Sequence, residues 1–162
     1  MGIMKVLDRI NKILDVVSRV FVAVVLLVIV MAVISQVISR YVYQFKIAWT
    51  QELATYLYIW MIFIGASLGL HRKEIVAITF LRDRMNPQLG IYLNVFNNII
   101  VVFFLVVGII YNCKITEIAK WQHSPVLNIP MNIVALSFTV SGVFMVSYLI
   151  EDSFNQFSKK TT

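Results

Sequence analysis

Charged residues are scarce in this chain, at 14% of its 162 residues. Soluble domains carry about 25%. Apolar residues make up 60%, which is more than a soluble core of this size can cover, because small domains leave much of their surface exposed. The composition therefore disfavours a soluble enzyme, a disordered regulator and a disulfide scaffold. It predicts an integral membrane protein, whose side chains mostly contact lipid.

Cysteine and histidine are nearly absent. Cys113 is the single cysteine, so neither an internal disulfide nor a metal-binding cysteine pair is available. The two histidines, His71 and His123, are expected on opposite sides of the bilayer and thus too far apart to share a haem iron. No phosphate-binding glycine loop, HExxH motif or nucleophile elbow occurs. We expect no cofactor, no bound metal and no enzymatic activity.

Four runs of 18 to 30 residues contain no Asp, Glu, Lys or Arg. A helix needs about 20 apolar residues to cross the hydrocarbon core, so each run allows one crossing. The predicted spans are 20–39, 53–70, 93–111 and 130–150. The first run is longer than the apolar part of a signal peptide and is followed by Arg40 and Tyr41 rather than a cleavage site. The chain, 1–162, is therefore expected to be a single all-α domain of four transmembrane helices.

Lysine and arginine are distributed unevenly between the two sides of the membrane. The N-terminal tail, the second loop and the C-terminal tail carry ten of them, against four in the other two loops. Because basic loops stay in the cytoplasm, both termini are predicted to be cytoplasmic. The net charge of +6 then reflects loops that face anionic lipid, and we expect no nucleic-acid partner.

Two segments outside the spans have helical character. Within residues 1–19, apolar side chains recur at steps of three and four residues, with charged side chains between them. This pattern predicts an amphipathic helix in the cytoplasmic interface of the bilayer. A short apolar stretch, Ile75–Leu81, is expected to form an interfacial turn of helix.

The predicted spans contain no Asp, Glu, Lys, Arg or His. Transporters and pumps that act alone usually need such groups within the membrane, because an ion or proton must be bound there. Their absence argues against a self-sufficient proton-coupled transporter and against an ion pump.

The spans do contain candidate packing residues. Gly65 and Gly69 form a GxxxG pair, a spacing that lets helices approach closely in lipid but is also common by chance. Asn94, Asn97 and Asn98 lie on one side of the third span. These amides either meet water in the headgroup region or contact another protein, and the sequence leaves both open.

The first outer loop has the most distinctive residues. Arg40 ends the first span and Glu52 begins the second, so we expect the two charges to face each other across a hairpin. Trp49 is suited to the headgroup region, and Tyr56 follows one turn after Glu52.

This arrangement resembles the DctQ-like small membrane subunit of tripartite ATP-independent periplasmic (TRAP) transporters. The resemblance covers nearly the whole chain. It rests on the basic N-terminus, Arg40-Tyr41, Trp49-Thr50-Gln51-Glu52, Gly65-Ala66, His71-Arg72-Lys73-Glu74 and Leu127-Asn128-Ile129-Pro130. The family often has two acids after the tryptophan, whereas this chain has Gln51-Glu52.

The resemblance implies a bacterial inner-membrane system of three proteins. A large membrane subunit would carry the sodium and substrate sites, and a periplasmic binding protein would capture an organic acid such as a dicarboxylate or sialic acid. The small subunit would be a non-catalytic scaffold that helps dock the binding protein. Its partner-interface candidates are Arg40, Trp49, Glu52, Tyr56, Gly65, Gly69, Asn94, Asn97 and Asn98. One alternative is a homo-oligomeric small multidrug-type exporter, but such an exporter needs an acidic residue within the membrane and this chain has none there. Another alternative is a cytochrome-associated or assembly factor, which only the size of the chain supports.

Overall fold

The computed structural model describes the backbone of residues 2–45, 47–72 and 87–159, and the side chains of 9–45, 47–72 and 96–153. It contains the helices α1 (Gly2–Val42), α2 (Ala48–His71), α4 (Pro87–Ala119) and α5 (Asn132–Lys159). The expected turn at Ile75–Leu81 and the side chain of Asn94 lie outside the described residues.

All four helices are long and apolar enough to cross a membrane. The apolar stretches within them are Arg9–Val42, Ala48–His71, Phe96–Ala119 and Asn132–Ser153. The expectation of an all-α protein with four membrane-spanning helices is thereby confirmed.

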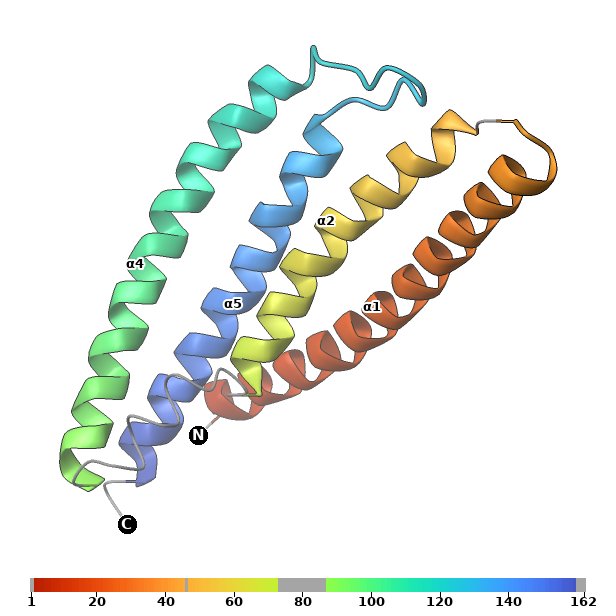
Figure 1. Cartoon of the computed structure of the whole chain (residues 1–162). Coiled ribbons are helices and arrows are strands. Elements are labelled where there is room, and N and C mark those ends of the chain that lie inside the picture. Colours follow the sequence, from red (N-terminus) through yellow and green to blue (C-terminus); the bar gives the residue numbers. More distant parts are fainter. Residues whose placement is uncertain (1, 46, 73–86, 160–162) are drawn as a thin grey trace.

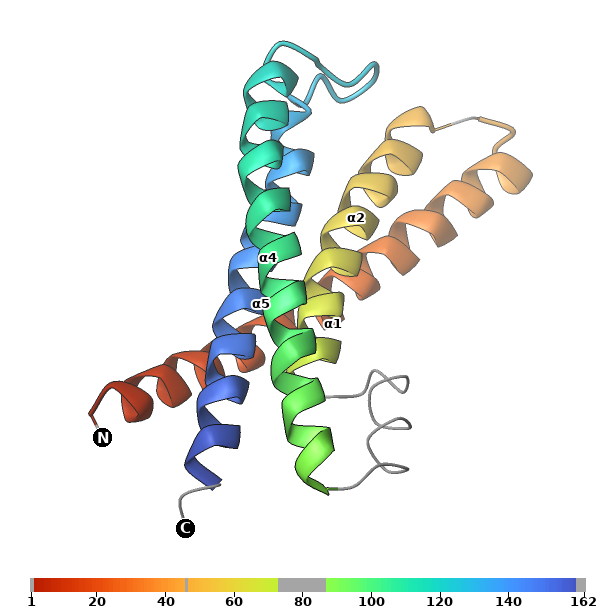
Figure 2. The same cartoon turned by 90° about the vertical axis from the view of Figure 1, so that its left-hand side faces the viewer.

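The N-terminal segment and the first span form one helix. Residues 1–19 were expected to lie apart from a span at 20–39, but α1 runs unbroken over 41 residues. After Gly2 this stretch contains neither proline nor glycine, so nothing in it terminates a helix. At 1.5 Å per residue its length is about 60 Å, roughly twice the hydrocarbon thickness. The helix must therefore tilt or extend beyond the core, and Figure 2 shows it running obliquely past α5.

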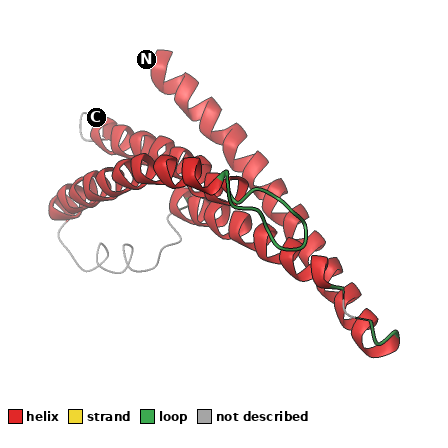
Figure 3. Cartoon of the chain, turned by 90° about the horizontal axis from the view of Figure 1, so that it is seen from above, coloured by secondary structure: helices red, strands yellow, loops and turns green. Residues whose placement is uncertain are grey.

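The helices α2 and α5 lie in the middle, with α1 and α4 at the two edges (Figure 1). Edge-to-face aromatic contacts join neighbours: Phe21 of α1 lies 6.3 Å from Trp60 of α2, and Phe63 of α2 lies 5.5 Å from Phe138 of α5, between ring centroids. α1 begins and α5 ends at one end of the molecule, which we call the terminal end; the opposite end is the distal end. Viewed from above, the start of α1 projects beyond the other helices (Figure 3).

The burial pattern is the reverse of that in a soluble bundle. The largest fully buried side chains are all polar: Asn11, Ser18, Thr50, Ser67, Ser137 and Ser141. Large apolar side chains are instead exposed, including Leu27 at 66%, Phe103 at 71% and Phe104 at 68%. Polar groups inside and apolar groups outside are what a lipid solvent favours, because lipid offers the polar atoms no partner.

Small residues bring α4 and α5 close together. A Cβ added at Gly108 would lie 2.9 Å from Phe138 Cζ, and one at Gly142 would lie 3.1 Å from Ile109. Gly65 and Gly69, in contrast, have open space where a side chain would be. The GxxxG pair therefore makes no close contact with another helix in the part of the chain that the structure describes.

Candidate functional site at the distal end

The loop between α4 and α5, residues 120–131, is the distal loop. It folds back on itself through backbone bonds from Ser124 N to Ile129 O (3.0 Å) and from Met131 N to Gln122 O (2.9 Å). The Ser124 hydroxyl also accepts the Ile129 N–H at 3.1 Å. Asn128 adopts a left-handed conformation with φ of 53°, which asparagine tolerates better than most residues. The tight reversal leaves the N–H groups of the residues at its tip without a backbone acceptor in the loop.

Glu52 supplies that acceptor. Its Oε2 accepts the backbone N–H of Leu127 at 2.8 Å and of Val126 at 3.2 Å. Its Oε1 accepts the hydroxyl of Tyr56 at 2.7 Å, one turn further along α2. Both carboxylate oxygens are thus occupied, and hydrogen bonds to a charged acceptor are stronger than those between neutral groups.

The Glu52 contact joins parts of the molecule that otherwise separate. Figure 2 shows α1 and α2 diverging from α4 and α5 toward the distal end. Glu52 belongs to the first pair of helices, and the distal loop connects the second pair. This carboxylate therefore fixes the distal loop against α2 at the end where the two pairs of helices diverge.

The expected pairing of Arg40 with Glu52 is not found. Arg40 is exposed at the end of α1 and forms no ion pair with Glu52 in the described part of the chain. The carboxylate is turned toward the distal loop instead, since two N–H groups and one hydroxyl already satisfy it. The sequence could not indicate this, because the partners lie 74 and 75 positions away.

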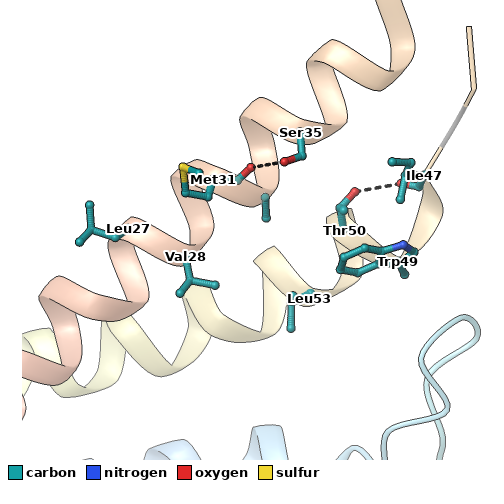
Figure 4. A pocket seen from close by; sticks show the side chains of 9 residues that line it. Leu27, Val28, Met31, Ser35, Ile47, Trp49, Thr50 and Leu53 are labelled. Atoms are coloured by element: carbon teal, nitrogen blue, oxygen red, sulfur yellow. Dashed lines mark hydrogen bonds between the residues drawn. The ribbon is translucent and has the colours of Figure 1, made fainter. Parts of the chain in front are cut away.

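Trp49 lies at a shallow groove between α1 and α2 (Figure 4). The groove has a volume of about 410 Å³ and is lined mostly by apolar side chains. Its two hydroxyls bond within their own helices, Ser35 to Met31 O at 2.8 Å and Thr50 to Ile47 O at 2.9 Å. The residues that line the groove include no charged side chain that could hold an organic anion or a cation.

Polar contacts also tie the helices together at the terminal end. Asn11 of α1 is fully buried and donates to the carboxylate of Glu151 and to Ser147 O (3.4 Å), while its own oxygen accepts the Ser147 hydroxyl at 2.7 Å. Asn98 of α4 donates to Asp152 at 3.2 Å and to Ser153 at 3.3 Å.

The sequence-predicted asparagines are thus not equivalent. Asn98 is 8% exposed and bonded to α5, whereas Asn97 is half-buried without a described partner. Asn112 was not predicted, although it joins α4 to α5 by donating to Ala135 O at 2.7 Å and Thr139 Oγ1 at 2.9 Å. The available signal was a lone amide in an apolar run, which lipid cannot satisfy. Among the described residues, no three His, Cys, Asp or Glu side chains gather as a metal site would require.

Comparison with known proteins identifies the family. Residues 29–159 match the family model of the DctQ component of tripartite ATP-independent periplasmic transporters. The chain is 25% identical over 157 residues to the "Sialic acid TRAP transporter small permease protein SiaQ" of Vibrio cholerae, covering 92% of this chain and 86% of that protein. It is 23% identical over 122 residues to the "Putative TRAP transporter small permease protein" of Haemophilus influenzae, covering 70% of this chain and 71% of that protein.

Members of this family are transporter components rather than enzymes. Four helices able to span a membrane fit a multi-pass protein of the inner membrane. The chain therefore belongs to the DctQ family of TRAP transporter small permease subunits.

Proposed function

We propose that this chain is a non-catalytic scaffold in a sodium-coupled TRAP transporter for organic acids. It lies in the bacterial inner membrane with both termini in the cytoplasm, bound to a large membrane subunit that carries the sodium and substrate sites. At the distal end, which faces the periplasm, it helps dock the substrate-binding protein.

The observation that carries this proposal is that several polar side chains form hydrogen bonds within the chain. Glu52 is bonded to the distal loop, Asn98 to Asp152, and Asn112 to Thr139. The central parts of the spans carry no ionisable side chain for a solute or an ion. Apolar side chains cover the exterior of the helices. Such a chain offers packing surface to a membrane partner but no path across the bilayer.

The substrate class rests on a relative. The Vibrio cholerae protein is named for sialic acid, an organic acid. A periplasmic binding protein and a large subunit follow from the tripartite family. The distal loop suits a docking role because Glu52 fixes its backbone while Trp121 stays 88% exposed.

Uptake by the reconstituted three-protein system tests the proposal. Sialic acid and a C4-dicarboxylate, with and without a sodium gradient, are the substrates to compare. Uptake should require this chain together with the large subunit and the binding protein, and Glu52→Ala should lower it while the complex is still recovered. Gln51→Ala is the control, because residue 51 is exposed and adjacent. Normal uptake by a fully recovered Glu52→Ala complex would refute the docking role, and uptake without this chain would refute the scaffold role.

A further inference from the structure

The first part of α1 has an unusual distribution of side chains. Asn11 and Ser18 are buried at 0% and 1% exposure against the rest of the protein. On the outward side, Val16, Val20 and Val24 are 55%, 58% and 53% exposed. The segment therefore buries these two uncharged polar side chains and exposes an apolar row, as a helix in contact with lipid does, while Arg9 and Lys12 before this row are also exposed.

Two arginines from different helices meet beside this apolar side. Arg19 of α1 pairs with the carboxylate of Asp15, and Arg72, at the end of α2, places its Nε 3.8 Å from the other oxygen of that carboxylate. The Asp15 side chain is only 13% exposed, whereas those of Arg19 and Arg72 are 53% and 40% exposed. One shielded carboxylate thus holds two guanidinium groups at the surface, and the three groups together carry one positive charge.

This combination matches the chemistry of an anionic phospholipid. The planar guanidinium group suits the geometry of a phosphate and binds it with paired hydrogen bonds. Ala23 and Leu26, four and seven positions after Arg19 and therefore on its face of α1, are exposed and continue toward the middle of the apolar stretch, where an acyl chain would extend. A soluble phosphate ion would engage the charges but leave the apolar side uncovered, so the arrangement favours a lipid.

We propose that Arg19 and Arg72 form a binding site for the phosphate of an anionic phospholipid, whose acyl chain lies along Ala23 and Leu26. The site requires only that the helices cross a bilayer. It depends neither on the scaffold role nor on which end faces the cytoplasm. Glu151, the other carboxylate near Asn11, is engaged by that amide and does not pair with either arginine among the described contacts.

Native mass spectrometry of the full chain in mild detergent tests the site. Phosphatidylglycerol and phosphatidylcholine are titrated separately, and the ratio of their apparent affinities is measured. Because one positive charge near an anionic lipid changes affinity by about fivefold, and Asp15 offsets one of the two arginines, the site predicts a preference of about fivefold for phosphatidylglycerol. Equal binding of the two lipids by the unaltered chain would overturn the proposal.

A triple variant, Asp15→Asn with Arg19→Gln and Arg72→Gln, removes the site without leaving a shielded carboxylate unpaired. It lowers the net charge by one, as does Arg40→Gln at the distal end, which serves as the matched control. The preference should disappear in the triple variant and persist in the control. Equal preferences in the two variants would refute the site.

Two further measurements test whether the guanidinium groups are required and whether free phosphate can replace the lipid. If the triple variant fails to fold, the double variant Arg19→Lys with Arg72→Lys replaces it. This variant keeps the charges but loses the paired hydrogen bonds of the guanidinium groups, so the preference for phosphatidylglycerol should fall severalfold. An unchanged preference would count against guanidinium binding.

Inorganic phosphate at millimolar concentration should not displace phosphatidylglycerol. Full displacement would show that a phosphate alone suffices, which contradicts the lipid assignment.

Discussion

The carboxylate of Glu52 accepts the backbone N–H of Leu127 at 2.8 Å, across 75 positions of sequence. The same oxygen accepts the N–H of Val126. One side chain near the start of α2 thereby holds the tip of a loop that connects α4 to α5. Removing it leaves two N–H groups of the distal loop without an acceptor, although water can reach them at this end of the molecule.

Glu52→Ala should therefore loosen the distal loop without disturbing the helices. Hydrogen exchange at the amides of Val126 and Leu127 should accelerate by about tenfold or more, since both N–H groups lose their charged acceptor. Exchange in the middle of α5 should stay as it is. In Gln51→Ala, the control, the loop amides should keep their protection. Unaltered exchange of the loop amides in Glu52→Ala would show that the carboxylate does not hold them.

Asn98 and Asn97 are adjacent amides with different contacts, and they should respond differently to the same substitution. Asn98→Ala removes the bonds to Asp152 and Ser153 and should lower the free energy of unfolding by about 1 kcal/mol, as expected for side-chain bonds between membrane helices. Asn97→Ala should change it little. Reversible unfolding in mixed micelles measures both values, and equal values for the two variants would contradict the assigned roles.

Glycines on two helices provide a similar contrast. Gly108→Val would press against the ring of Phe138, which already packs on Phe63, and should destabilise the chain by about 1–3 kcal/mol. A Cβ added at Gly65 meets nothing within 4 Å among the described residues, so Gly65→Val has open space there. Its stability when isolated should therefore be nearly unchanged.

Recovery of the complex tests whether Gly65 contacts the large subunit or simply faces lipid. If the open side of the GxxxG pair contacts the large subunit, Gly65→Val should reduce recovery of the complex while leaving the isolated chain stable. Full recovery would remove Gly65 from the list of interface residues. A large loss of stability in the isolated chain would instead contradict the helix packing described above.

The orientation in the membrane can be tested with single cysteines in a Cys113→Ser background. Trp121→Cys lies in the distal loop at a position that is 88% exposed, and Arg9→Cys lies at an exposed position near the start of α1. With both termini in the cytoplasm, a membrane-impermeant maleimide should label the first variant in cells with an opened outer membrane. It should label the second only after the inner membrane is permeabilised. The opposite pattern would invert the topology.

Sequence reasoning anticipated the four helices because lipid imposes a length and a composition on each span. The charges in residues 1–19 led us to predict a helix separate from the first span. No residue after Gly2 ends a helix there, however, and α1 continues through both segments. Glu52 was recognised as a candidate, but its partners were not, since a contact between α2 and the distal loop depends on how the helices pack. Asn11 and Asn112 were missed because an isolated amide reveals its partner only in three dimensions.

The scaffold role is tested most directly by purifying the tagged chain from its own host in mild detergent and identifying the proteins that accompany it by mass spectrometry. We predict a stoichiometric partner that is a much larger multi-span membrane protein, recovered through a sizing column. A stable homo-oligomer of this chain alone, with no larger membrane protein present, would contradict the account and favour a small self-assembling exporter.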